Sequence, residues 1–333
     1  MRLQDLPRPL ARRCLGLPRF CRDSLGVDIR GRHLVVAYST GLDSTALLHI
    51  LHLLSGPLGL TLAAAHAHHG LRPESDDELE HARATCARLG VPLDTARLDV
   101  PGAMRPGGPG LEECARDLRY AFLSSVLARR GADFVVTAHH GDDLAEDILM
   151  RLVRGTGWPA LGGMPGAAAS RRLLRPLLDW EKGELRSLLE ALGATWHEDP
   201  TNDCPDRTRN RIRHDVLPLL RRENPALAKT LRQVWTLARI DEDYWASTLP
   251  GLPERADGFL VEAPLLEGHP ARRLRLCKRV LDSMGPGQAL AAHLLLLDRA
   301  WQEGRVGRCI QFPGDKTACV ESGGIRFSRR VRI

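Results

Sequence analysis

Small and hydroxyl-bearing side chains follow an apolar run near the start of this chain, in a pattern that suits phosphate binding. Residues 33–38 are apolar and partly β-branched, as in a strand buried on both faces. Residues 39–45 have the sequence Ser-Thr-Gly-Leu-Asp-Ser-Thr, and residues 46–54 are typical of a helix packed on its sheet. A strand, a tight loop and a helix N-terminus direct free backbone N–H groups and a positive dipole end at one point. The sequence therefore predicts an anion site, most often a phosphate site, at this loop.

The side chains of the loop extend this chemistry. The hydroxyls of Ser39, Ser44 and Thr45 add hydrogen-bond donors, and the carboxylate of Asp43 is a potential Mg²⁺ ligand. The loop differs from both G-x-x-x-x-G-K-[ST] and G-x-G-x-x-G, so the two commonest nucleotide-binding motifs are excluded. An ordinary strand-to-helix turn without a ligand is the alternative that the loop alone leaves open.

The elements around this loop alternate between strands and helices. Further strands are expected at 60–66, 92–100 and 133–137, and helices at 74–89, 111–130, 142–154 and 181–192. Residues 1–32 are expected to form a leading helix, and residues 101–110, which are rich in glycine and proline, a mobile loop. The alternation predicts an α/β fold with a doubly wound parallel sheet and right-handed crossovers.

Polar clusters follow three of the expected strands, at residues 39–44, 66–72 and 138–143. Ligands of parallel sheets bind at the carboxyl ends of the strands, so we expect these clusters to converge. For a single histidine pair, a capping or solvated role is the alternative.

The pattern becomes mainly helical after about residue 224. Helices are expected at 227–245, 271–281 and 290–301, and alternation at 309–312 and 325–333 indicates a small β-unit. We therefore expect an α/β domain at residues 1–220 and a mainly helical domain at 221–333. Residues 155–166, where apolar residues alternate with glycine, are either a loop that folds over a ligand or a disordered connector.

The composition is that of a globular protein with room for two domains: 333 residues, 43% hydrophobic and 26% charged. No apolar run is long enough to cross a bilayer and the start of the chain lacks the apolar core of a signal peptide, so we expect a cytoplasmic protein without membrane contact. The net charge of +6 suits a polyanionic partner. Nearly all of the positive charge is arginine, which genome base composition also produces, so the charge is supporting evidence only.

The eight cysteines include no C-x-x-C pair. This spacing argues against zinc ribbons, iron–sulfur ligation and a disulfide framework. We expect free buried or surface thiols.

The motifs, taken together, resemble those of bacterial tRNA(Ile)-lysidine synthetases, which are PP-loop ATP pyrophosphatases. The resemblance covers roughly residues 30–220 and is carried by the loop at 39–44, by His69-Gly70-Leu71-Arg72, by Glu112 with Ala115-Arg116 and Arg119-Tyr120, by 137–143 with Glu146, by 151–157, by Arg175-Pro176-Leu177-Leu178, and by 198–202 with 209–214. Thr40 departs from the glycine that is usual in the loop of this family, and Asp147 from the usual threonine.

The resemblance implies a carbon–nitrogen ligase that joins free L-lysine to carbon 2 of the wobble cytidine of tRNA(Ile) with a CAU anticodon. ATP adenylates the cytidine, AMP and pyrophosphate are released, and the codon read changes from AUG to AUA while charging changes from methionine to isoleucine. The residues implied to bind ATP are Ser39, Thr40, Gly41, Leu42, Asp43, Ser44, His69 and Arg72. The catalytic residues implied are Asp43, Asp143, Glu146, Glu112 and Arg116, with Mg²⁺ on Asp43 and Asp143.

Contacts with tRNA phosphates are expected from Arg207, Arg209, Arg211 and Arg213 and from the second domain. Trp158 is a candidate for stacking on the target base, although packing is the commoner role of such a side chain. The sequence leaves the oligomeric state open, a homodimer included.

Two other functions share part of this pattern. A tRNA thiolase uses the same ATP chemistry but needs cysteines to carry sulfur or bind a cluster, and the missing C-x-x-C argues against it. A tRNA-binding protein with a decayed ATP site is suggested only by Thr40.

Overall fold

The computed structural model describes residues 2–68, 74–104, 110–198, 208–251 and 258–329, and the chain forms two compact units. The first comprises Met1–Glu146 and Met164–Arg232, and the second comprises Asp147–Gly163 and Gln233–Ile333. The chain changes unit three times: inside helix α6 (Gly141–Val153), after Gly163, and inside helix α10 (Leu227–Thr248). The boundary thus differs from the one expected after residue 220.

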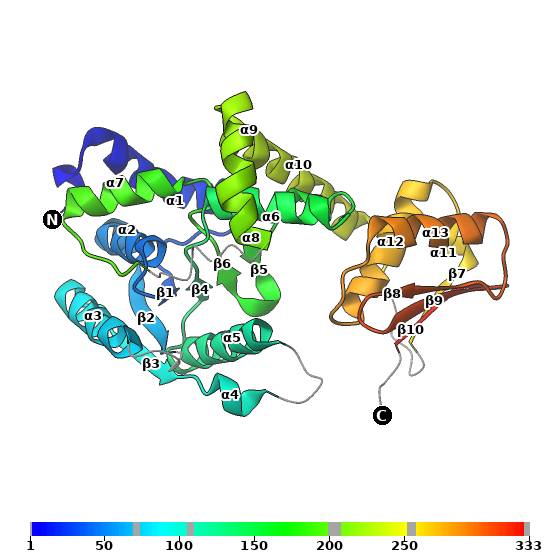
Figure 1. Cartoon of the computed structure of the whole chain (residues 1–333), viewed down its shortest axis with the longest axis horizontal. Coiled ribbons are helices and arrows are strands. Elements are labelled where there is room, and N and C mark those ends of the chain that lie inside the picture. Colours follow the sequence, from blue (N-terminus) through cyan, green and yellow to red (C-terminus); the bar gives the residue numbers. More distant parts are fainter. Residues whose placement is uncertain (1, 69–73, 105–109, 199–207, 252–257, 330–333) are drawn as a thin grey trace. The chain divides into compact units, whose positions relative to one another are not determined.

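A six-stranded sheet forms the centre of the first unit (Figure 1). Its order is β3-β2-β1-β4-β6-β5, where the strands are β1 (His33–Ala37), β2 (Thr61–His68), β3 (Leu93–Arg97), β4 (Phe134–Val136), β5 (Ala167–Ala168) and β6 (Leu173–Leu174). All neighbours run parallel except β5 and β6, so the predicted doubly wound parallel sheet is confirmed, with one antiparallel pair at its edge. Only the short turn η3 (Ala169–Arg171) joins these two strands, and a connection this short joins antiparallel strands.

Helices cover both faces of this sheet, as the doubly wound fold requires. Leu34 and Val36 of β1 pack in an apolar cluster with α1 (Arg8–Leu25), α2 (Leu42–Leu58), α3 (Glu74–Leu89) and α7 (Lys182–Leu192). Val35, between them, packs in a second cluster with α5 (Leu111–Arg129). Successive side chains of a strand point to opposite faces, so an apolar run such as 34–36 has to be buried on both sides.

Residues 100–103 differ from the expected mobile loop. They form the short helix α4 (Val100–Ala103), and β3 ends at Arg97 before the expected end at residue 100. The Asp99 carboxylate accepts a hydrogen bond from the Gly102 amide, and Pro101 lies in the first turn, where its missing N–H is not needed. Residues 105–109 lie outside the described part of the chain.

A series of short helical segments precedes α10 in the first unit. These are α8 (Thr208–Arg211), a π-helical turn (Ile212–Val216) and α9 (Leu217–Glu223), while η1 (Leu3–Asp5) precedes α1. Within the described residues, no helix of either unit is both long and apolar enough to span a bilayer.

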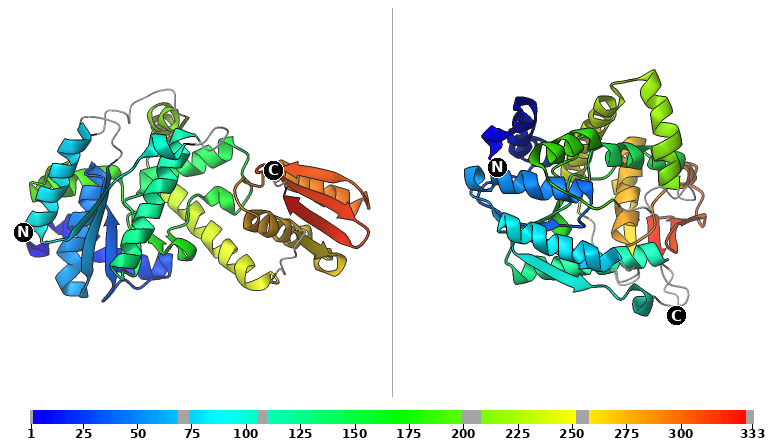
Figure 2. Two further views of the ribbon diagram at one scale, coloured as in Figure 1. Left: turned by 90° about the horizontal axis from the view of Figure 1, so that it is seen from below. Right: turned by 60° about the vertical axis from the view of Figure 1, so that its left-hand side comes forward.

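The second unit combines helices with a small antiparallel sheet (Figure 2). Its further helices are η2 (Ala160–Gly162), α11 (Ala263–Leu266), α12 (Pro270–Ser283) and α13 (Ala291–Gln302). The sheet has the order β7-β10-β9-β8, with β7 (Phe259–Glu262), β8 (Cys309–Phe312), β9 (Lys316–Glu321) and β10 (Gly324–Arg329). Of these elements, the sequence predicts α12, α13 and the strands at β8 and β10, but not η2, α11, β7 or β9.

Lys316 is completely buried in this unit. Its Nζ donates to the carbonyl oxygens of Leu281, Gly285 and Gly287 at 2.6, 2.7 and 2.8 Å. A cation at the end of α12 suits the negative end of the helix dipole. It satisfies the Leu281 carbonyl, one of the last four of the helix, and two carbonyls just beyond the helix.

Two cysteines of the second unit correct the expectation of free thiols. Cys309 and Cys319 lie directly opposite each other in β8 and β9 and form a disulfide. Directly opposed positions of antiparallel strands bring Cβ atoms within about 5 Å, a proximity that linear spacing does not reveal. Cys14, Cys21, Cys86, Cys114 and Cys277 are free and buried, as expected.

Candidate active site at the carboxyl edge of the sheet

The loop between β1 and α2 presents an open helix N-terminus. Gly41 is the N-cap of α2, with extended backbone, and no side chain of the described residues caps this end. The hydroxyl of Ser44 instead ties the loop together: it accepts a hydrogen bond from the Ser39 amide at 3.1 Å and lies 3.1 Å from the Gly41 carbonyl oxygen. The first amides of α2 are therefore available to an anion, as the sequence predicts.

Thr40 occupies the tightest position of this loop. Its φ is +64°, in the left-handed region, and its side chain is completely buried. The Thr40 carbonyl oxygen accepts hydrogen bonds from the His197 amide at 3.0 Å and from the Thr45 hydroxyl at 3.2 Å. The family's usual glycine would adopt this φ without cost, so the structure gives a physical reason for that preference.

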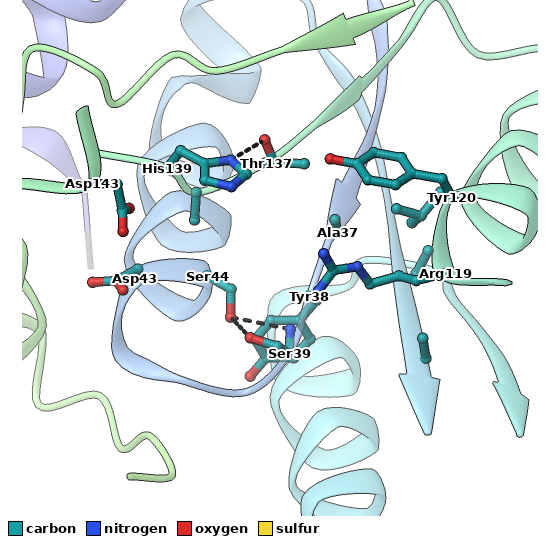
Figure 3. A pocket seen from close by; sticks show the side chains of 14 residues that line it. Ala37, Tyr38, Ser39, Asp43, Ser44, Arg119, Tyr120, Thr137, His139 and Asp143 are labelled. Carbon is teal, nitrogen blue, oxygen red and sulfur yellow. Dashed lines mark hydrogen bonds between the residues drawn. The ribbon is translucent and has the colours of Figure 1, made fainter. Parts of the chain in front are cut away.

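A pocket of about 230 Å³ lies beside the loop, at the carboxyl ends of β1, β2 and β4 (Figure 3). Its lining includes Ser39, Asp43 and Ser44 from the loop and α2, and His139 and Asp143 from the segment that enters α6. Two of the three expected polar clusters, 39–44 and 138–143, therefore converge. Of the third cluster, residues 69–72 lie outside the described chain.

His140 brings the two aspartates expected to bind metal together. Its Nε2 lies 3.5 Å from a carboxylate oxygen of Asp43 and 3.5 Å from one of Asp143. Burial alone would lower the pKa of His140, but the carboxylates of Asp143, Asp43 and Asp142 outweigh it and raise the pKa to about 9. Burial would raise the pKa of Asp143, whereas the neighbouring His140 and Arg209 lower it, so this carboxylate stays ionised at neutral pH.

The chemistry of these carboxylates fits Mg²⁺. The Oδ1 atom of Asp43 is buried and has no hydrogen-bond partner within the described residues. Those residues contain no group of three or more His, Cys, Asp or Glu side chains suited to a metal. Mg²⁺ is commonly held by one or two carboxylates together with substrate phosphates, which is what a pair of aspartates beside an anion loop provides.

Glu146 lies on α6 next to Asp143, but its oxygens are turned to arginines. Its Oε2 accepts from Arg209 Nε at 2.6 Å, and its Oε1 accepts from Arg213 Nε at 2.5 Å. Arg209 also donates to Asp143 Oδ1 at 2.7 Å. The Glu146 side chain is 1% exposed and does not line the pocket, so in this structure it is a fully paired buried carboxylate.

The pocket lining also includes Arg119, Tyr120 and His139, which received no role from the sequence. Arg119 and Tyr120 reach into the pocket from α5, and His139 lines it from the end of β4, where burial lowers its pKa to about 4 (Figure 3). Arg119 is three residues beyond Arg116 on the same helix, a spacing that would have marked both as one helix face.

Other expected site residues lie apart from the pocket or outside the description. Arg116 and Arg211 are exposed, and neither lines the pocket. Trp158 belongs to the second unit, where its indole nitrogen donates to Asp241. His69, Arg72 and Arg207 lie outside the described residues, and the structure describes Glu112 only as part of the α5 backbone.

Comparison with known proteins shows the family to which the chain belongs. Residues 20–220 match the PP-loop domain. The chain is 47% identical over 330 residues to a tRNA(Ile)-lysidine synthase of Nitratidesulfovibrio vulgaris, covering 92% of this chain and 95% of that relative. This chain belongs to the tRNA(Ile)-lysidine synthase family. A member from Thermus thermophilus is 38% identical over 296 residues, which cover 87% of this chain but 55% of the longer relative.

The fold of this family member is shared more widely. The U34-tRNA thiolase NcsA of Methanococcus maripaludis, solved with its [4Fe-4S] cluster, has a TM-score of 0.57 and 18% identity, over 70% of this chain and 80% of that chain. At this identity the likeness concerns the fold alone. PP-loop domains use ATP, which supports ATP binding at the open N-terminus of α2.

Proposed function

We propose that this chain uses ATP and free L-lysine to convert the wobble cytidine of tRNA(Ile) with a CAU anticodon into lysidine, in the cytoplasm. One observation carries the proposal: an open helix N-terminus and two carboxylates share a pocket, in a chain whose relatives are tRNA(Ile)-lysidine synthases. The modified base pairs with A instead of G, so the tRNA reads AUA and is charged with isoleucine.

In the first step, the carbon-2 oxygen of the cytidine attacks the α-phosphorus of ATP. The bond between the α-phosphorus and the oxygen that bridges to the β-phosphate breaks, and pyrophosphate leaves with that oxygen. Negative charge grows on the departing β- and γ-phosphates. The open amides of α2 and the hydroxyls of Ser39 and Ser44 surround the loop where this charge would develop.

Asp43 and Asp143 would hold Mg²⁺ in this reaction. Bound there, the ion would neutralise phosphate charge as pyrophosphate leaves. Asp43 is the better placed of the two, because it belongs to the first turn of α2 and its Oδ1 atom has no hydrogen-bond partner within the described residues.

In the second step, the ε-nitrogen of lysine attacks carbon 2 of the adenylated cytidine. The bond between carbon 2 and its oxygen breaks, and AMP leaves with the oxygen. The ammonium of free lysine has a pKa near 10.4 and must lose a proton before it can attack. Asp143, ionised and at the pocket wall, would attract the ammonium, and Glu146 or Glu112 are the other candidates for accepting the proton.

Binding of the tRNA would involve both units. Arg207, Arg209, Arg211 and Arg213 are candidates in the first; for Arg209 and Arg213, phosphate binding would replace their present ion pairs with Glu146. In the second unit, a hollow of about 310 Å³ is lined by Trp245, by the cationic side chains Arg275, Lys278 and Arg279, and by the carboxylates Glu242 and Asp282, of which Asp282 pairs with Lys278. The guanidinium of Arg275 lies 5.3 Å from the Trp245 ring centre. Cations beside an aromatic face are typical of single-stranded RNA sites.

A reaction with all three substrates tests this function. Purified protein is incubated with lysine, ATP and the tRNA, and the nucleosides are then analysed by mass. A gain of one lysine less one water at cytidine supports the proposal. An exchange of oxygen for sulfur would indicate a thiolase, and an unchanged tRNA that still binds would indicate a binding protein.

The variant Asp43→Ala tests the role of the loop in the same assay. We expect adenylation to fall about 100-fold or more, because charge stabilisation at the leaving phosphates is lost. Binding of tRNA should stay within about twofold, since phosphate contacts of the RNA are made elsewhere. Retained turnover in this variant would refute the metal role of Asp43.

A further inference from the structure

Three arginines surround the ring of Tyr120 at the α5 side of the pocket. The guanidinium carbons of Arg116, Arg119 and Arg171 lie 5.1, 5.7 and 5.2 Å from the ring centre. Two of them come from α5 and the third from η3, between β5 and β6. We call Tyr120 and these three arginines the arginine cage. A single aromatic ring interacts favourably with a cation within about 6 Å, but it does not neutralise three.

The charge of the cage has no acidic counterpart among the described side chains. None of the three arginines forms an ion pair with a described carboxylate, in contrast to Arg129 of the same helix, which pairs with Asp94. Burial lowers the pKa of Arg119, and the nearby Arg116 lowers it further. Gathering like charges at a partly buried place is unfavourable unless an anion binds there. The cage is therefore built for an anion that comes with a ligand.

The position of the cage identifies which substrate carries this anion. In the proposed function, the open end of α2 would bind the triphosphate and Asp143, elsewhere in the pocket lining, would attract the lysine ammonium. Arg119 and Tyr120 line the pocket from the α5 side (Figure 3). Arg116 and Arg171 are exposed and are not among the lining residues. The positive charge thus continues from the pocket to the surface. A nucleotide bound at the loop is too compact to contact arginines both inside and outside the pocket. An RNA strand that enters the pocket from solvent has phosphates along its length that can contact both.

We propose that the arginine cage binds backbone phosphates of the RNA strand that carries the target cytidine, with Arg116 and Arg171 outside the pocket and Arg119 inside it. This inference rests on the proposed function and adds to it the side from which the RNA enters. It gives Arg116 a role in binding the RNA in place of the catalytic role that the resemblance implies. It also assigns a role to Arg171, which no motif in the sequence marks.

The test is the double variant Arg116→Gln/Arg171→Gln, which removes two charges and leaves Arg119 and Tyr120 in place. The dissociation constant of the tRNA is measured without ATP over a range of salt concentrations. Each phosphate contact to a single strand contributes about 0.7 to the slope of log affinity against log salt, so we expect the slope to fall by about 1.4. At 0.1 M salt the same loss corresponds to roughly 25-fold weaker binding. The KM values for ATP and lysine should stay within twofold.

Two further variants complete the design. Arg129→Gln removes one charge from the same helix outside the cage and should leave the slope as in the wild type. Arg116→Lys/Arg171→Lys should recover most of the slope, because lysine also binds phosphate as a point charge. An unchanged slope in the double glutamine variant would overturn the inference, as would a rise in the KM for ATP with unchanged tRNA affinity.

The readouts separate this inference from the proposed function. If the wild type makes no lysidine but the salt slope of the double variant falls as expected, the proposed function is refuted and RNA binding by the arginine cage is supported. If the wild type makes lysidine and the double variant binds tRNA as the wild type does, RNA binding by the arginine cage is refuted and the proposed function is supported.

Discussion

Thr40 holds a left-handed backbone conformation in the middle of the phosphate loop, where a β-branched side chain rarely occurs. Its hydroxyl lies 2.6 Å from the Ser39 carbonyl oxygen and donates to it, so the side chain contributes a local hydrogen bond. Two further hydrogen bonds fix the backbone at this position, because the Thr40 carbonyl oxygen accepts from the His197 amide and from the Thr45 hydroxyl. Backbone strain of about 1–3 kcal/mol is tolerated at such a position when the surroundings fix it.

Two substitutions of Thr40 separate strain from hydrogen bonding. Thr40→Gly removes the strain and the hydroxyl, and we expect a free energy of unfolding equal to the wild type or about 1 kcal/mol higher. Thr40→Val keeps the β-branch and loses the hydrogen bond, and we expect a loss of about 1 kcal/mol or more. Urea unfolding of the wild type and of both variants gives their order of stability. A glycine variant less stable than the valine variant would show that strain is not the governing effect.

At the scale of elements, α2 is buried along most of its length, and it includes a histidine. His49 is 8% exposed, and its Nε2 is buried without a hydrogen-bond partner in the described residues. Burial lowers its pKa to about 4, with smaller effects of Arg88 and His52. The folded protein therefore keeps this ring neutral at pH values at which the unfolded chain, with a pKa near 6.5, already binds a proton.

Because the pKa of His49 is lower in the folded than in the unfolded state, the free energy of unfolding decreases as the pH falls below 6.5. Above pH 6.5 neither state of His49 is protonated, and its pKa shift has no effect; as pH falls from 6.5 toward 4, only the unfolded state gains the proton, so stability is lost. At pH 5 the loss amounts to about 2 kcal/mol. We expect His49→Leu to lose about 2 kcal/mol less than the wild type between pH 7 and pH 5, measured by urea unfolding. Other histidines contribute equally to both proteins and cancel, so equal losses would contradict the shift.

Elements with a sustained period or apolar run could be predicted from the sequence, and several elements without one could not. The span expected for α3 matches the structure at both ends, and those for α5 and β1 match within one residue, because each has a sustained period or apolar run. The helix after the loop starts at Leu42, earlier than residue 46, because Asp43 and Ser44 have the composition of a turn but lie in its first turn. β5 and β6 have two residues each, too few for any periodicity.

The same distinction applies to the candidate site. The meeting of Asp43 and Asp143 at one pocket could be predicted, because each follows a recognisable strand and parallel strands end at one edge. The pairing of Glu146 with Arg209 and Arg213, and the approach of Arg171 to Tyr120, depend on tertiary packing between distant segments. A sequence pattern gives the type of a side chain but not its partner across the fold.

At the scale of the whole molecule, the two units are interleaved along the chain. Residues 147–163 lie between two parts of the first unit but belong to the second. Trp158 donates to Asp241 and Arg239 donates to the Gly163 carbonyl oxygen, while Gly162 lies against Ala238 of α10. A Cβ at Gly162 would come within 2.2 Å of the Ala238 Cβ, so this contact is close enough to require glycine.

A fragment of residues 1–232 therefore retains the whole first unit but leaves 147–163 without these partners. We expect the fragment to bind an ATP analogue, because the pocket beside the loop belongs to the first unit. We also expect trypsin to cut after Arg151 and Arg154 at least about tenfold faster than in the full chain, since local opening governs cleavage. In the full chain Arg151 donates to the Ala160 carbonyl oxygen, a contact within the second unit. Residues 158–163 contact α10, which the fragment lacks beyond residue 232, so this hydrogen bond should open more often in the fragment. Mass spectrometry of the digest gives both rates, with cleavage after Arg129, in the first unit, as the internal standard. Equal rates at Arg151 and Arg154 in the two proteins would show that this segment is held by the first unit instead.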